Sequence, residues 1–196
     1  GSSSSFTVGL LNAIYAYKRV PVTAKRLARE AIYIEQHLNR ENVGSQDQIN
    51  AAYGGFNRIR FHKDGKFSVT PISISQARKN DLSDNLMLFY TGIMRTAEDV
   101  ASSYATSPEE RASQFTALSK ITTRAGEIIE GSGSLNEIGE LLHQSWMVKK
   151  ELSAKVSNPV VDKIYDLARL AGALGGKLTG AGGGGILLID TVNLTT

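Results

Sequence analysis

The chain has 196 residues, of which 41% are hydrophobic and 21% charged, so we expect one folded domain or two small ones and exclude a disordered or collagen-like chain. The 22 Lys and Arg against 19 Asp and Glu give a net charge of +3, and no basic run alternates with aromatic residues, so neither nucleic acid nor an anionic membrane is expected as a partner. Without cysteine, a signal peptide or the roughly 20 consecutive apolar residues of a membrane span, the sequence predicts a cytoplasmic protein with no disulfides and no thiolate chemistry.

The first third of the chain is predicted to be helical and then to form a β-hairpin. An apolar helical pattern runs up to Tyr17, and residues 23–40 form a helix with one apolar face. Residues 41–55 lack a long period and indicate a loop, a short helix and a Gly-Gly turn. Strands at 56–62 and 67–74 follow, with Lys63-Asp64-Gly65 as the hairpin turn.

Helices dominate the rest of the chain. A strand at 85–90 is predicted first, buried on both faces. Ser107-Pro108-Glu109-Glu110 is a capping box with proline at the first helical position, so a helix should start there and end near Glu130. Two more helices are expected, over 135–152 and from Asn158-Pro159 to Gly175-Gly176, followed by a last strand at 186–189. This mixed order of strands and helices predicts an α+β fold.

Two glycine-rich segments stand out. The opening GSSSS is either a flexible linker or a turn at a helix N-terminus, whose N–H groups and hydroxyls could meet phosphate or magnesium. Residues 180–185 match G-x-G-x-x-G, but a helix precedes them and a strand follows, which excludes a Rossmann site. A Walker A loop fails because Ala171 and Leu178 stand where glycine and Ser or Thr are required. The remaining local interpretation is a tight turn packed against neighbouring backbone.

Two carboxylates are candidates for chemistry. Glu35 falls between Ala28 and Ala31 in the apolar stripe of its helix, where a carboxylate needs a cation or hydrogen-bond donors. It is therefore either half of a structural salt bridge or a magnesium ligand. Asp47 is either the N-cap of the short helix after it or a base that accepts a hydroxyl proton.

The order and spacing of these features resemble the GHMP kinase superfamily, which includes galactokinase, homoserine kinase, mevalonate kinase and phosphomevalonate kinase. GSSSSFTVGLLNA resembles the family's phosphate-loop motif without its first residues, and KLTGAGGGGILL (177–188) resembles its third motif. Glu35 and Asp47 have the spacing of the galactokinase-type magnesium glutamate and catalytic aspartate.

The resemblance implies a two-domain α+β fold with ATP and Mg²⁺ as cofactors. Residues 1–75 would be the remainder of the N-terminal, ATP-binding domain and 76–196 an incomplete C-terminal domain, with further chain expected at both ends. Asp47 would be the catalytic base, and Ser3 (or Ser2) with Glu35 would bind magnesium. The implied nucleotide-binding residues are Gly1, Ser2, Ser3, Ser4, Gly180, Ala181, Gly182, Gly183 and Gly184.

The substrate class follows from longer segments. VGSQDQINAAYGGFNRIRF (43–61), LMLFYTGIMR (86–95) and residues 138–185 look most like sugar kinases of the D-glycero-D-manno-heptose 7-phosphate kinase type, which phosphorylate the anomeric hydroxyl of a heptose phosphate for nucleotide-activated heptose and surface polysaccharide. A galactokinase- or fucokinase-like enzyme, which shares the Asp-Gln pair and the Gly-Gly turn, is the alternative, and a non-catalytic sugar-phosphate-binding relative is another. A homodimer is left open. The candidate substrate-binding residues are Asp47, Tyr53, Gly54, Gly55, Arg95 and Lys149.

Lys149 and Arg95 are chosen for their positions. Lys149 lies in the middle of the apolar stripe of the 135–152 helix, and Arg95 follows the 85–90 strand. Each either extends its charge to solvent or is held inside for an anionic substrate. The three histidines, His37, His62 and His143, show no metal-ligand spacing and are given no role. His37 and His143 are predicted to lie on polar helix faces.

Overall fold

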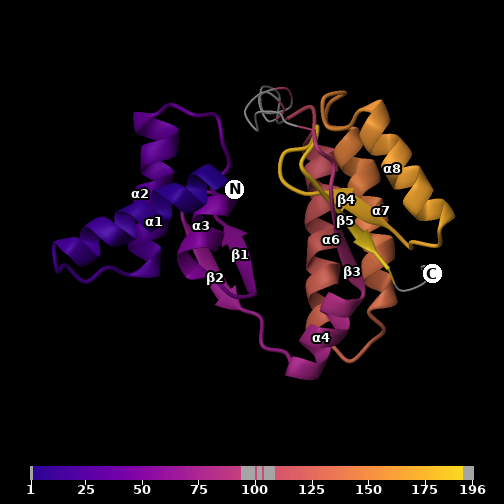
Figure 1. Cartoon of the computed structure of the whole chain (residues 1–196), viewed down its shortest axis with the longest axis horizontal. Helices are drawn as coiled ribbons and strands as arrows, with labels where there is room; N and C mark the ends of the chain where they lie inside the picture. The colour runs from indigo at the N-terminus through magenta and orange to yellow at the C-terminus, as the bar shows by residue number, and fades with distance from the viewer. Residues whose placement is uncertain (1, 94–99, 101–102, 104–108, 192–196) are drawn as a thin grey trace. The chain divides into compact units, whose positions relative to one another are not determined.

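The computed structural model describes residues 2–93, 100, 103 and 109–191. The chain divides into two compact units, Gly1–Ile72 and Ser73–Thr196, which we call the N-terminal and C-terminal units (Figure 1).

The N-terminal unit consists of helices followed by a hairpin, as predicted. The two strands are antiparallel, with Asn57 opposite Pro71 and Phe61 opposite Phe67. Gly65 has φ 76°, a conformation that glycine adopts without steric cost, so it makes the hairpin turn. The elements are α1 (Ser2–Tyr17), α2 (Ala24–Tyr33), the π-helical turn η1 (Ile34–Leu38), α3 (Gln46–Tyr53), β1 (Asn57–Phe61) and β2 (Phe67–Pro71).

Helices α1, α2 and α3 pack together around a small apolar core. The Thr23 side chain caps α2 by accepting a hydrogen bond from the Arg26 backbone N–H at 3.2 Å, which satisfies one of the free donors of the first turn. Val8, Leu27 and Ala31 form the buried cluster.

The helix predicted over 23–40 changes character at its end. Its first part is the α-helix α2, but Ile34–Leu38 widens into a π-helical turn with Asn39 N–H bonded to Ile34 O at 2.8 Å. Isolated π-turns are rare and occur often at functional sites. A periodicity of 3.6 residues could not predict this turn, but it placed Glu35 in the apolar stripe, and the residue is buried.

The C-terminal unit combines an antiparallel sheet of order β3-β5-β4 with helices packed on it. Helices α6 and α7 lie side by side, and α7 packs against β4 and β5 (Figure 1). In the sheet, Leu86 lies opposite Asp190 and Gly176 opposite Ile189. The described elements are α4 (Gln76–Asp84), β3 (Leu86–Tyr90), α6 (Ala112–Glu130), α7 (Asn136–Lys150), α8 (Pro159–Leu170), β4 (Gly176–Leu178) and β5 (Ile186–Asp190).

The core of this unit lies between the sheet and helices α7 and α8. Trp146 is fully buried at its centre and lies 6.4 Å from the ring of Tyr165 on α8. Leu178, Leu187 and Ile189 contribute the inner face of the sheet.

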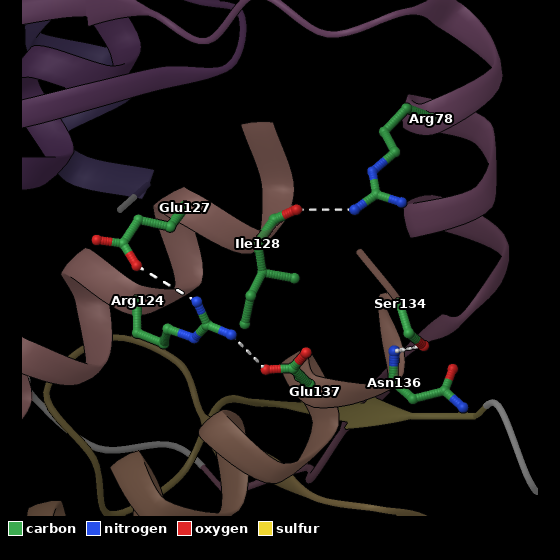
Figure 2. Close-up of polar contacts among 7 residues, drawn as sticks. All are labelled: Arg78, Arg124, Glu127, Ile128, Ser134, Asn136 and Glu137. Carbon is green, nitrogen blue, oxygen red and sulfur yellow. Dashed lines mark hydrogen bonds and ion pairs between the residues drawn. The ribbon is translucent and has the colours of Figure 1, made fainter. Parts of the chain in front are cut away.

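Arginine side chains tie α4 and α7 to the end of α6 (Figure 2). The Arg78 guanidinium donates to Ile128 O at 2.7 Å and to Ile129 O at 3.4 Å, which satisfies carbonyls that the helix end leaves free. Arg124 on α6 pairs with Glu137 on α7 at 2.8 Å. Helix α4 was not predicted from the sequence, and it buries no side chain of its own, so no apolar face marks it.

Two predictions about elements of the C-terminal unit are wrong. Strand β3 is not buried on both faces. Leu88 and Tyr90 on one face are 64% and 71% exposed, and Met87 and Phe89 on the other are 43% and 40% exposed. Helix α8 ends at Leu170 rather than at Gly175-Gly176. Gly172, with φ 107°, ends it earlier, and Gly176 starts strand β4 instead.

The predicted capping box falls partly outside the described residues. Ser107 and Pro108 lie there, and Glu109 and Glu110 form a turn. Within the described chain, α6 begins at Ala112.

Candidate active site

Glu35 is the most deeply placed acidic group of the N-terminal unit. It lies on the π-turn η1 and is 1% exposed. One carboxylate oxygen, Oε2, accepts hydrogen bonds from Ser4 Oγ at 2.9 Å and from Gln48 Nε2 at 2.5 Å. Ser4 comes from α1 and Gln48 from α3, so three elements converge on one carboxylate.

The other oxygen of Glu35, Oε1, has no hydrogen-bond partner among the described residues, although it is buried. No ion pair to Glu35 is found in that part of the chain either, so the hypothesis of a structural salt bridge has no support there. A buried, unpaired carboxylate oxygen is energetically costly. A hard cation such as Mg²⁺ takes carboxylate oxygens as ligands, so this residue fits a magnesium site.

The opening serines form the first turn of α1 rather than a linker. Ser4 is 4% exposed and contacts Glu35, whereas Ser2 and Ser3 are exposed at the helix start. Backbone N–H groups in a first helical turn lack intrahelical partners, and they favour anions. Gly1 lies outside the described residues.

Asp47 is the second residue of α3 and is exposed. The N-cap of this helix is Ser45, so the interpretation of Asp47 as the N-cap is wrong. Asp47 directly precedes Gln48, so the candidate base and a partner of Glu35 lie in the same helical turn.

The Gly-Gly turn follows α3, as predicted. Gly54 and Gly55 have φ of 59° and 71°, which favour glycine, and Asn57 Nδ2 donates to Gly54 O at 2.5 Å. The ring of Tyr53 makes an edge contact with Phe67 at 6.4 Å between centroids. These candidate substrate residues therefore belong to the same unit as Asp47.

The 180–185 loop joins β4 to β5 in the C-terminal unit. A Cβ on Gly182, at φ 124°, would lie 2.8 Å from Val156 O, and one on Gly184 would lie 2.7 Å from Ile93 O. This close backbone approach explains why glycine is needed at these two positions. That the loop braces the phosphate-binding turn of the N-terminal unit stays a prediction.

Lys149 does not extend into solvent. It is 8% exposed, and its ammonium donates to Leu178 O at 3.2 Å and to Gly180 O, at the start of the glycine-rich loop. Its role toward a substrate phosphate stays a prediction, and Arg95 lies outside the described residues.

Several polar residues of the structure were not singled out in the sequence. Gln48 is fully buried against Glu35, and the only sequence clue was its position next to Asp47. Lys177 donates to Ser145 Oγ at 3.2 Å, and burial lowers the pKa of its ammonium.

The placement of His143 on a polar face was wrong. Its ring is partly buried and stacks on Tyr165, whose hydroxyl lies 2.6 Å from His143 Nδ1. Burial, with the nearby charges of Arg169 and Lys150, lowers the pKa of the His143 imidazole.

The described residues contain neither a membrane-spanning helix nor a cluster of metal-binding side chains. No helix in that part of the chain has both the length and the apolar character to cross a bilayer. No group of three or more His, Cys, Asp or Glu residues gathers there as a metal cluster.

Comparisons with known proteins agree on one family. Residues 1–55 match the GHMP kinases N terminal domain, and residues 125–191 match the GHMP kinases C terminal domain. The chain is 31% identical to D-glycero-alpha-D-manno-heptose 7-phosphate kinase of Campylobacter jejuni, over 95% of this chain and 56% of that protein. It is 27% identical to the bifunctional fucokinase/GDP-fucose pyrophosphorylase of Arabidopsis thaliana, over 96% and 18% of the two chains.

The same fold occurs in solved kinase structures. The crystal structure of L. major mevalonate kinase in complex with R-mevalonate superposes with a TM-score of 0.72, covers 97% of this chain and 56% of that one, and is 24% identical. The chain thus spans about half the length of relatives such as the Campylobacter kinase. The predicted α+β fold with N- and C-terminal GHMP kinase domains is confirmed, and the chain belongs to the GHMP kinase family.

Proposed function

We propose that this protein is a sugar kinase that transfers the γ-phosphoryl group of ATP to a hydroxyl of a sugar or sugar phosphate, with Mg²⁺ as cofactor. The observation that carries the proposal is the buried carboxylate of Glu35. Its Oε1 has no hydrogen-bond partner among the described residues, and its Oε2 accepts a hydrogen bond from Gln48 of α3, the helix that also carries Asp47. An acidic metal ligand and an exposed carboxylate on adjoining elements are the parts that phosphoryl transfer requires.

Glu35 and Ser3 would hold the metal, which supplies charge neutralisation on the phosphate oxygens. Asp47 would accept the proton of the substrate hydroxyl while the hydroxyl oxygen forms its bond to the γ-phosphorus and the bond to ADP breaks. Mg²⁺ is commonly held by one or two protein oxygens together with substrate phosphates, so the small number of protein ligands is compatible with this role.

The nucleotide phosphates would lie at the N-terminus of α1, against Gly1 to Ser4, because its free N–H groups favour anions. Residues Gly180 to Gly184 would support that phosphate site from the C-terminal domain. In this proposal residues 1–75 belong to the ATP-binding domain and residues 76–196 to the C-terminal domain. The sugar would be bordered by Tyr53, Gly54 and Gly55.

For the substrate we favour D-glycero-D-manno-heptose 7-phosphate, phosphorylated at its anomeric hydroxyl. The 31% identity to the Campylobacter heptose 7-phosphate kinase supports this choice. A fucokinase- or galactokinase-like substrate is the second candidate, supported by the 27% identity to the Arabidopsis fucokinase.

The test is ATP turnover by the intact protein with heptose 7-phosphate, galactose, fucose or mannose as acceptor. The proposal expects ADP release that depends on both sugar and Mg²⁺, fastest with the heptose phosphate. Fastest turnover with fucose or galactose would select the second candidate. Sugar-phosphate binding without turnover would support the non-catalytic relative instead.

A further inference from the structure

We propose that Gln48 is a positioning residue that fixes the Glu35 carboxylate so that Oε1 is the oxygen left for the metal. The inference rests on the proposed function, since it assigns a residue that orients the metal ligand of that reaction. It starts from the two hydrogen bonds to Oε2 and from the absence of any described partner for Oε1.

The orientation of the Gln48 amide follows from its partner. An ionised carboxylate can only accept hydrogen bonds, so the NH₂ group of Gln48 must face Glu35. The contact is buried on both sides, because Gln48 is 0% and Glu35 1% exposed. Water therefore cannot easily replace the amide as donor, and its loss would leave Oε2 with Ser4 alone among the described donors.

The terminal torsion of a glutamate is broad and roughly two-fold, so an unrestrained carboxylate exchanges its two oxygens readily. Donors on one oxygen remove that freedom. With Ser4 and Gln48 both on Oε2, the carboxylate presents Oε1 in one direction. Groups that orient a metal ligand in this way typically change metal affinity by 10–100-fold when they are mutated.

The position of Gln48 adds a second consequence. Gln48 follows Asp47 in α3, so one helical turn carries both the candidate base and the amide that orients the metal ligand. The amide contact spans 13 residues of sequence and links α3 to η1. The candidate base on α3 and the candidate metal ligand on η1 are thereby linked by a side-chain contact as well as by the backbone.

Gln48→Met tests the proposal, because it keeps the length of the side chain and removes the donor. Gln36→Met is the matched control, since Gln36 lies on η1 next to Glu35 and donates to Val43 O at 2.8 Å and to Ser45 Oγ at 3.1 Å. The readout is Mn²⁺ binding to the intact protein with a non-hydrolysable ATP analogue, followed by electron paramagnetic resonance. We expect Mn²⁺ binding to weaken about tenfold or more in Gln48→Met and to stay at the wild-type value in Gln36→Met.

A double variant separates positioning from general damage. In a Glu35→Gln background, adding Gln48→Met should cause no further loss of Mn²⁺ affinity, because the carboxylate that Gln48 orients is gone. If Gln48→Met does not fold, Gln48→Asn shortens the reach of the amide by one methylene and should give the same loss.

Wild-type Mn²⁺ affinity in the folded Gln48 variant, or an equal loss with and without the Glu35 carboxylate, would overturn the positioning role alone. If the wild-type protein bound no metal with the nucleotide analogue, the proposed function would fail, and this inference with it.

Discussion

The two carboxylates differ in their surroundings, and that difference separates their expected roles. Glu35 is buried with two donors on one oxygen, whereas Asp47 is exposed at the start of α3. Burial with an unpaired oxygen suits a metal ligand. Exposure on a helix start suits a group that must reach a substrate proton.

Asp47→Asn should lower kcat by about 10²–10⁴-fold, because asparagine keeps the size of the side chain but cannot accept the hydroxyl proton. Asp47 is not at the N-cap position of α3, which Ser45 occupies, so the stability of the helix should change little. Steady-state kinetics with saturating ATP measure the effect. A melting curve and a nucleotide-binding titration on the same sample serve as controls. Wild-type turnover in a folded variant that binds ATP would exclude Asp47 as the base.

Glu35→Gln and Ser3→Ala should each raise the Mg²⁺ concentration needed for half-maximal rate, because the first replaces an anionic carboxylate by a neutral amide and the second removes a hydroxyl oxygen. Ser5→Ala, another exposed serine in the same first turn, is the control and should leave the Mg²⁺ requirement unchanged. Titrating the rate with Mg²⁺ at fixed ATP measures all three. An unchanged Mg²⁺ dependence in both test variants would refute the metal assignment.

At the scale of elements, the glycine-rich loop depends on contacts from outside itself. Gly183 N–H bonds to Val156 O at 2.8 Å, and Asn158 Nδ2 donates to Gly183 O at 2.9 Å. Lys149 on α7 reaches the first turn of the loop through Gly180 O. The loop is thus held in one conformation by α7 and by the segment before α8.

Lys149→Met should lower the free energy of unfolding by about 1–3 kcal/mol, because the carbonyls of Leu178 and Gly180 lose their cationic donor in a buried place. Denaturant titration measures this loss. The same variant tests the substrate hypothesis through its KM. If Lys149 also holds a substrate phosphate, KM should rise far more for heptose 7-phosphate than for a free sugar. Equal changes in KM would make Lys149 a structural residue only.

At the scale of the whole molecule, the stability of the chain should depend on pH near neutrality through His143. Burial, the largest cause, lowers the pKa of this imidazole below its ordinary value of 6.5, so the folded state binds a proton less readily than the unfolded state. Stability is then complete above pH 6.5 and falls as the pH drops through that value toward the folded pKa.

His143→Gln should flatten this dependence, because glutamine keeps a polar group near the Tyr165 hydroxyl but does not titrate. Denaturant titrations at steps between pH 7.5 and 5.5 measure the slope for both proteins. Most carboxylates titrate below this window, so they contribute little to the difference between the two slopes. Parallel slopes would show that His143 binds protons equally in both states.

The sequence alone predicted those features that local pattern encodes. The helices with apolar faces, the helix start at Asn158-Pro159, the hairpin at Asp64-Gly65 and the Gly-Gly turn after α3 appear near their expected places. The GHMP kinase resemblance also came from short motifs and their order, and it is confirmed by the two matched domains. Such features depend on residues a few positions apart, so they can be recognised without the fold.

Only the tertiary structure decided what surrounds each candidate residue. Ser4 lies 31 residues before Glu35 and Gln48 lies 13 after it, and no local period reports such contacts. The same holds for the carbonyls of Leu178 and Gly180, which lie 29 and 31 residues after Lys149, and for the exposure of the β3 side chains. Burial and hydrogen bonding depend on which segments meet in space, so a sequence can mark Glu35 as unusual, but only the fold shows which of its oxygens is left without a partner.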